Sequence, residues 1–216
     1  MARMNPVDRR EAIIAAALRV MIVKGLASTT VRDVAEAMGT SSGLIHHYFT
    51  SMDDLLAAAF ERAAAEDLRG IQESMAGGEG ALARLRIFFG NYTRADQDWA
   101  FQLWLDAWAE AGRRPAVRAT SQRLNIAWQQ VLVGCIRAGV AEGVLSCADP
   151  EAAGWRILSL LDGLALQAVA HRVAIEREDV VKWSVAHAET ELGLPAGTLQ
   201  TGNATSEDRP NSEPGG

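Results

Sequence analysis

The chain has 216 residues, of which 49% are hydrophobic and only six are proline. This composition favours packed helices over sheet or disorder. The net charge of −6 argues against nucleic-acid binding over the whole surface, but residues 1–50 hold six basic and four acidic side chains, so a balance of +2 there leaves −8 for the rest. Only the N-terminal part is therefore suited to meet phosphates.

Helix-capping patterns define the first four predicted helices. Thr30 with Asp33 three residues later is a capping-box pattern, and Pro6 after Asn5 suits the first turn of a helix. The expected ranges are Asn5 to about Gly25, Thr30 to Gly39, Ser41 to about Tyr48, and Ser51 to about Met75.

Longer and more apolar helices are expected after the break at Gly77 and Gly78. Their predicted ranges are 79–95, 98–111, 115–141, 150–172 and 176–192. From Ala196 the chain is polar and rich in Gly, Pro, Ser and Thr, which predicts a disordered tail over 196–216. The fold class is therefore all-α.

The segment from Thr30 to Phe49 has the pattern of a helix-turn-helix. Gly39 can adopt the left-handed turn between the two short helices, and Ala35 is small where those helices must cross. The residues expected to face a DNA groove are Arg32, Ser41, Ser42 and Gly43. Those expected over the sugar-phosphate backbone or the groove wall are His46, His47 and Tyr48.

Other roles remain open for these residues. Arg32 could be a solvated helix residue, and one of the two adjacent histidines could simply pack. A metal site at His46 and His47 is not expected, because metal ligands on a helix favour i, i+4 spacing. Cys135 and Cys147 lie twelve positions apart without a CxxC pattern, so neither a disulfide framework nor a zinc site is predicted. No cofactor is expected.

These motifs resemble the N-terminal domain of the TetR family of transcriptional regulators, which residues 9–68 follow nearly throughout. The resemblance rests on Thr30-x-Arg-Asp-x-Ala-x-x-x-Gly39, on His47-Tyr-Phe49 and on Asp54-Leu-Leu56. Gly43 to Phe49, Trp99 to Trp108 and Ile157 to Leu164 resemble more narrowly the choline-responsive betaine repressors of the BetI subgroup.

The resemblance implies a three-helix DNA-binding domain in 1–50, with the family domain reaching 68, and a helical ligand-binding and dimerisation domain in 51–195. It implies a base contact for Arg32, a phosphate contact for Thr30, and a recognition helix that begins at Ser42 and Gly43. Two positions depart from the family pattern: His46 replaces a common tyrosine, and Met52 replaces a lysine that contacts phosphate. The helix N-terminus capped by Ser51 still offers backbone amides to a phosphate.

The second half contains a candidate ligand site. Phe101, Trp104 and Trp108 recur along one helical stripe, a pattern that is more often core than pocket. Asp162 lies inside an apolar run, and a buried carboxylate needs a partner or a function. Its structural alternative is a pair with Arg156, His171 or a backbone amide. With Trp128 as a further wall, these residues predict a cationic or amine-bearing ligand; a neutral apolar or aromatic ligand is the alternative.

The resulting hypothesis is a homodimeric repressor that binds a near-palindromic operator and is released by a small-molecule inducer, which tilts the fourth helix. A ligand-independent regulator or activator, or an adaptor that binds no DNA, remains an alternative. An enzyme is not expected, because the sequence lacks a glycine-rich phosphate loop, a nucleophile with its base, and a metal set. Neither a signal-peptide core nor a membrane span is apparent, which predicts a cytoplasmic protein.

Overall fold

The computed structural model describes residues 5–92, 98–171 and 175–200, and these residues form helices and no strand. The helices are α1 (Pro6–Lys24), α2 (Val31–Ala37), α3 (Ser42–Tyr48), α4 (Met52–Ala76), α5 (Gly80–Asn91), α6 (Asp98–Ala111), α7 (Pro115–Ala141), α8 (Pro150–His171) and α9 (Arg177–Glu191). The predicted all-α class is confirmed, and the ranges predicted for α6 and α7 agree with the structure. The expected extensions over 93–95 and 172 lie outside the described residues.

The capping residues recognised in the sequence begin the helices as expected. The backbone N–H of Asp33 donates to the Thr30 hydroxyl at 3.3 Å, and the Thr30 N–H donates back to the Asp33 carboxylate at 2.9 Å. Ser51 accepts in the same way from the N–H of Asp54 at 3.1 Å. These bonds satisfy amides that a helix N-terminus otherwise leaves unpaired, which explains why α2 and α4 start where they do.

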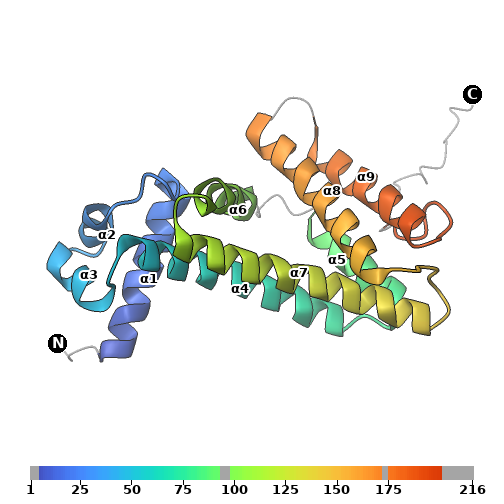
Figure 1. Ribbon diagram of the computed structural model, residues 1–216, viewed down its shortest axis with the longest axis horizontal. Helices are drawn as coiled ribbons and strands as arrows, with labels where there is room; N and C mark the ends of the chain where they lie inside the picture. Colours follow the sequence, from blue (N-terminus) through green and yellow to red (C-terminus); the bar gives the residue numbers. More distant parts are fainter. Residues whose placement is uncertain (1–4, 93–97, 172–174, 201–216) are drawn as a thin grey trace, which may run out of the picture.

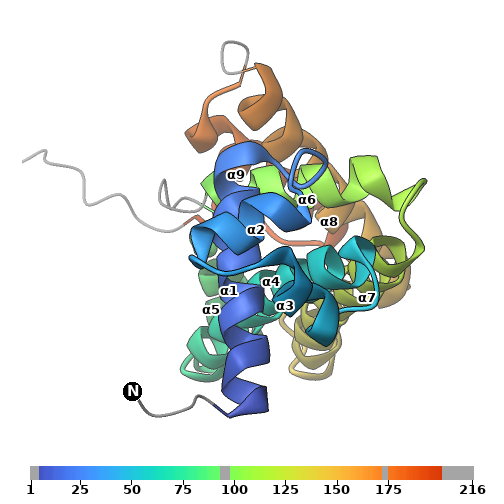
Figure 2. The same ribbon diagram turned by 90° about the vertical axis from the view of Figure 1, so that its left-hand side faces the viewer.

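The helices form an elongated molecule with α1, α2 and α3 gathered at one end (Figure 1). α4 and α7 run side by side along the long axis, and α8 and α9 lie toward the opposite end. Seen from the α1–α3 end, the two short helices α2 and α3 are nearest the viewer (Figure 2). The helix-turn-helix is therefore presented at one tip of the molecule.

Two apolar cores lie along this axis, and both include part of α4. The first joins α1–α3 to the N-terminal half of α4 as far as Ala64, and the second takes up α4 from Leu68 onward. Trp104 of α6 packs against both cores. α4 and α6 thus connect the two halves of the molecule.

The chain after α9 differs from the sequence prediction at residues 196–200. A disordered tail was expected from Ala196, but these residues form a turn in which Leu199 is fully buried. The buried carboxylate of Glu189 accepts hydrogen bonds from the N–H groups of Gly197 and Leu199 at 2.9 and 2.6 Å. Composition missed this because a single buried leucine and a distant carboxylate hold the turn. Residues 201–216 lie outside the described residues.

Candidate DNA interface and ligand cavity

The turn between α2 and α3 orients the two short helices. Gly39 has φ 62°, the left-handed region that glycine enters without steric cost. Val34, Ile45 and Phe49 are buried against α1 and α4, while Met38 is half-buried. The apolar sides of both helices are therefore fixed in the first core, and their polar sides remain outside.

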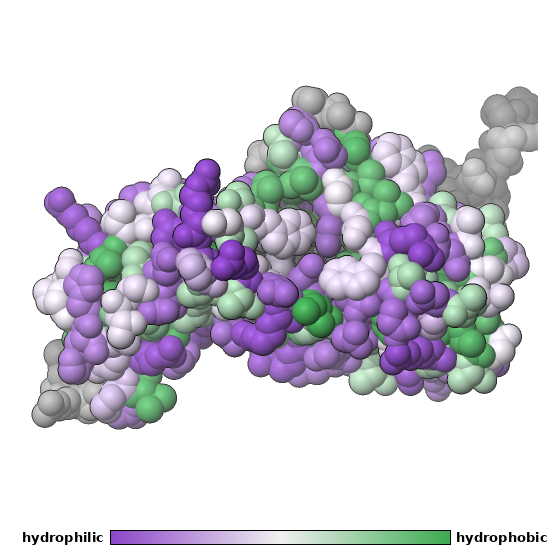
Figure 3. Space-filling view, viewed as in Figure 1, coloured by the Kyte–Doolittle hydropathy of each residue, from purple (hydrophilic) through white to green (hydrophobic). Residues whose placement is uncertain are grey.

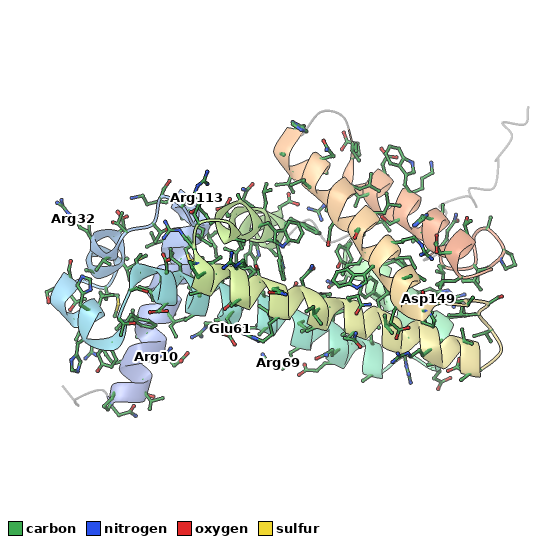
Figure 4. All side chains as sticks on the ribbon, in the orientation of Figure 1. Arg10, Arg32, Glu61, Arg69, Arg113 and Asp149 are labelled. Carbon is green, nitrogen blue, oxygen red and sulfur yellow. The ribbon has the colours of Figure 1, made fainter. Side chains whose placement is uncertain are left out.

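The residues predicted to contact DNA lie on this outer side. The exposed ones are Thr30, Arg32, Ser41, Ser42, Gly43, His46 and His47, and Tyr48 is half-buried. Arg32 extends away from α2 at the tip of the molecule (Figure 4), and no ion pair involves it among residues 5–92, 98–171 and 175–200. The Tyr48 ring meets the His47 ring edge-on at 5.1 Å between centroids, which restrains both. This group forms a continuous polar surface on α2 and α3.

Two residues near this surface are already engaged within the chain. The Thr30 hydroxyl donates to the Asp33 carboxylate at 2.6 Å, and Lys24 reaches the same carboxylate at 2.6 Å. The Lys24 and Thr30 bonds lower the pKa of Asp33 to about 2, so it stays ionised. Met52 at the start of α4 packs its side chain against the first core. Its thioether is neutral, so this position offers no positive charge to a phosphate.

A small cavity of about 50 Å³ lies between α4, α5, α6, α7 and α8. All five residues predicted to bind ligand line it: Phe101, Trp104, Trp108, Trp128 and Asp162. The cavity is also lined by Asp67, Asn91, Tyr92 and Asn125, none of which was predicted from the sequence. They come from α4, the end of α5 and α7, and no local pattern in those segments distinguishes them from ordinary helix residues.

The aromatic walls of this cavity contact one another and the first core. The Trp104 and Trp108 rings lie 5.7 Å apart, and Trp104 meets Phe60 of α4 edge-on at 4.9 Å. Trp128 is buried, and its indole N–H has no hydrogen-bond partner among the described residues. Such walls suit a ligand with a cationic or apolar surface.

Asp162 supplies the acidic group of the cavity. Burial raises the pKa of its carboxyl to about 7. Its carboxylate has no ion pair or hydrogen bond within the described part of the chain, and Arg156 instead pairs with Glu191 at 2.9 Å. The alternative of a structural pair for Asp162 is therefore not what the structure contains.

Polar bonds tie α6 to the end of the molecule formed by α1–α3 and the start of α4. Asp106 of α6 does not line the cavity; its carboxylate accepts a hydrogen bond from the Leu26 N–H at 2.9 Å. Arg114 bonds Glu110 of α6 at 2.8 Å and Asp53 of α4 at 2.6 Å. The helix that carries Trp104 and Trp108 is thereby linked to both the α1–α2 loop and the start of α4.

Comparison with known families identifies this arrangement. The model of bacterial regulatory proteins of the TetR family matches residues 13–59, and that of the C-terminal part of BetI-type transcriptional repressors matches residues 81–193. The chain belongs to the TetR family and carries a BetI-type C-terminal domain. The resemblance inferred from the sequence is confirmed for both parts of this regulator.

Relatives and solved structures agree with this assignment. A BetI transcriptional regulator from Stenotrophomonas maltophilia is 34% identical over 54% of this chain and 63% of its own length, so that match spans less than two thirds of the relative. The BetI regulator of Pseudomonas aeruginosa PAO1 is 26% identical over 90% of this chain and 98% of its own.

The fold is shared with solved regulators. A transcriptional regulator from Pseudomonas aeruginosa PAO1 has a TM-score of 0.75 and 26% identity, covering 87% of this chain and 92% of that one. A regulator from Saccharomonospora viridis, solved in complex with choline, has a TM-score of 0.77 and 23% identity, covering 86% and 98%.

Two further features of the structure concern metal binding and membrane insertion. Among the described residues, no cluster of three or more His, Cys, Asp or Glu side chains could hold a metal ion. No helix in the same residues is long and apolar enough to cross a membrane.

Proposed function

We propose that this TetR-family chain is a ligand-responsive repressor: a dimer that binds a near-palindromic operator and releases it when a small cationic inducer occupies the cavity at Asp162. The observation that carries the proposal is the convergence of two tryptophans and an unpaired carboxylate on one cavity, Trp104, Trp108 and Asp162. Indole faces attract cations, and a carboxylate supplies the opposite charge.

DNA recognition rests on the outer surface of α2 and α3. α3 is the recognition helix, its first residues Ser42 and Gly43 face the major groove, and Arg32 reaches a base edge from α2. His46, His47 and Tyr48 contact the sugar-phosphate backbone. Because the Thr30 hydroxyl already donates to Asp33, Thr30 meets phosphate through a weaker contact than its position alone suggests.

Dimerisation uses α8 and α9. Apolar side chains gather over these helices in Figure 3, and the exposed side of the pair includes Trp155 and Trp183, which are 39% and 43% exposed. Exposed apolar surface of this kind marks a protein contact. A twofold axis beside α8 would pair α8 and α9 of each copy in a four-helix interface and place the two recognition helices on one side of the DNA.

The ligand controls DNA binding through α6 in this proposal. A cation between Trp104, Trp108 and Asp162 shifts α6, and the bonds from Asp106 to Leu26 and from Arg114 to Asp53 carry that shift to α1 and α4. The ligand must prefer the state that does not bind DNA, since only a difference in affinity moves the equilibrium.

The test measures DNA binding and ligand binding on the same protein. DNA fragments that the protein selects from a random library are titrated by fluorescence anisotropy, with and without choline and other quaternary ammonium compounds. A cation that weakens binding by about 5- to 150-fold, the usual range of coupling, supports the proposal. Selection of no DNA would favour an adaptor, and stabilisation only by neutral aromatic compounds would contradict the cation site.

A further inference from the structure

A second, larger cavity adjoins the first. It measures about 430 Å³, lies between α1, α6, α8 and α9 and is partly open to solvent, and its described walls include Ile22, Trp99 and Ala168. Tyr92 and Phe101 line both cavities. The side chains of these two residues therefore lie where the two spaces meet.

The separating side chains form a stacked group. The Tyr92 and Phe101 rings lie 5.7 Å apart, and the Arg177 guanidinium lies 5.8 Å from the centre of the Phe101 ring. Arg177 also donates to the Tyr92 backbone carbonyl at 3.1 Å and pairs with Asp98. Phe101 is only half-buried, so its ring can turn aside without unfolding α6.

The two cavities differ in chemistry along α8. Asp162 and Leu166 face the first, whereas Ala165, Ala168 and Val169 face the second. Residues 162–169 extend over about 10 Å at 1.5 Å per residue. A path of that length therefore begins at an acidic, indole-lined end and continues into a space that has apolar walls from α8 and polar ones from Asp98 and Glu176.

The first cavity alone is small for a ligand. Its 50 Å³ has room for only about four water molecules, at roughly 10 to 15 Å³ each. A cationic head has to widen it, and a chain attached to that head has no space there. The second cavity has the volume for such a chain, and Ile22, Ala168 and Val169 give it an apolar wall beside its polar residues.

We propose that the inducer is an elongated amphiphilic cation, with its charged head at Asp162 and an alkyl or aryl chain that passes Tyr92 and Phe101 into the second cavity. This inference rests on the cation site of the proposed function. The chain would reach Ile22 of α1, so that the ligand contacts the DNA-binding end directly.

The test compares ligands with one head and different chains. Binding of tetramethylammonium, butyltrimethylammonium, hexyltrimethylammonium and octyltrimethylammonium is measured by calorimetry below micelle-forming concentrations. The affinity should rise about two- to fourfold per added methylene, with one ligand bound per chain. Equal affinities across the series would overturn the inference and leave the cation site intact. Binding of none of these cations would overturn both.

Variants at two positions distinguish binding of the alkyl chain in the second cavity from non-specific adhesion to the protein surface. Ala168→Phe fills the second cavity and should abolish the gain with chain length while keeping the tetramethylammonium affinity within about twofold. Ala168→Leu serves the same purpose if the larger ring impairs folding. Ala109→Phe, on the exposed side of α6 and outside both cavities, should keep the gain. If Ala168→Phe and Ala168→Leu both keep the gain as well, the chain does not occupy the second cavity.

Discussion

The carboxylate of Asp106 accepts a hydrogen bond at 2.9 Å from the backbone N–H of Leu26, which lies eighty residues earlier in the chain. Leu26 follows Gly25, whose φ of 82° turns the chain out of α1. A Cβ atom at Gly25 would lie 3.2 Å from the same carboxylate oxygen, so the loop and α6 are closely fitted. This hydrogen bond therefore joins α6 directly to the loop between α1 and α2.

Replacing Asp106 should weaken communication more than ligand binding. Asp106→Ala removes the acceptor of a half-buried N–H, which costs about 1 to 3 kcal/mol of unfolding free energy. Inducer affinity should change little, since Asp106 does not line the cavity, but the inducer should release less DNA. Chemical denaturation, calorimetry and anisotropy measure the three quantities. Ala109→Gly is the control, because it weakens α6 by about 1 kcal/mol from an exposed position outside both cavities; an equal loss of release there would point to a general effect on α6.

The affinity for cations should depend on pH through Asp162. Burial raises the pKa of this carboxyl to about 7, and a bound cation favours the ionised form, so binding releases a proton below that pH. Affinity should therefore rise up to about tenfold per unit as the pH increases toward 7, then level off. Asp67 and Tyr92 line the same cavity, so Asp162→Asn is the necessary comparison. A slope that persists in Asp162→Asn would assign the titration to another group.

The same carboxyl should lower the stability of the protein above neutral pH. A folded-state pKa above the unfolded value means that the folded chain binds the extra proton, so its unfolding free energy decreases as the pH rises from about 4 through 7. Asp162→Asn removes this penalty. The variant should gain stability relative to the original chain at pH 8 and little at pH 4, as measured by urea denaturation. A gain of equal size at both values would mean that the ionised form carries no burial penalty.

Arg32 should contribute to the choice of DNA sequence. Arg32→Ala should cost about 1 to 3 kcal/mol on selected DNA and less on random DNA, because a base-edge contact carries sequence information. Arg113→Ala is a suitable control, since Arg113 is also highly exposed but lies at the end of α6 (Figure 4). Anisotropy at one fixed salt concentration measures all four affinities. Equal losses for Arg32→Ala on both DNAs would make Arg32 a phosphate contact.

A charge at Gly163 should separate the dimer without disturbing the single chain. A Cβ atom at Gly163 would meet nothing within 4 Å, and this position lies on the exposed side of α8. Gly163→Glu should therefore give a helical monomer with weak DNA binding, as seen by sedimentation and circular dichroism. Gly134→Glu on α7 is equally unhindered and should leave the dimer unchanged. A Gly163→Glu protein that still sediments as a dimer would place the interface elsewhere.

The turn after α9 should contribute to stability even though it lies near the end of the chain. Leu199 is fully buried, and Arg86 donates to the Thr198 carbonyl at 2.7 Å. Leu199→Ala should reduce the unfolding free energy by about 2 to 5 kcal/mol through loss of buried apolar surface. Gln200→Ala changes an exposed neighbour and should have almost no effect. Similar denaturation midpoints for the two variants would show that the turn is not held by Leu199.

Local signals allowed the helices and the helix-turn-helix to be predicted. The Thr30–Asp33 capping box and the glycine at position 39 act over a few residues, so their structural effect can be read without knowing the rest of the fold. The prediction of a disordered tail was wrong for residues 196–200, because Glu189 and Leu199 hold this turn through tertiary contacts.

The candidate ligand site was only partly predictable for the same reason. The stripe of Phe101, Trp104 and Trp108 and the isolated acid at Asp162 were visible as patterns, and they line one cavity. Asp106 lies on the same helix as the tryptophans, yet its carboxylate is bonded to Leu26, and Tyr92 had no distinguishing context. Whether an acid meets a ligand or a backbone N–H depends on how α6 sits against α1, which spacing within one helix does not determine.

α4 spans both cores as one unbroken helix, so a tilt at one end would be transmitted to the other. Its 25 residues make a rod about 37 Å long at 1.5 Å per residue, anchored in one core at each end. Asp67, the α4 residue at the cavity, lies about 22 Å along the helix from its start at Met52. A rotation of about 5° there would displace that start by about 2 Å, and by about twice that between the two copies of the proposed dimer. Since successive base pairs are about 3.4 Å apart, a displacement of that size would move the two α3 helices out of register with the major grooves. In the proposed mechanism, a ligand that tilts α4 would thus leave each DNA-binding domain intact and alter only the spacing between the two α3 helices.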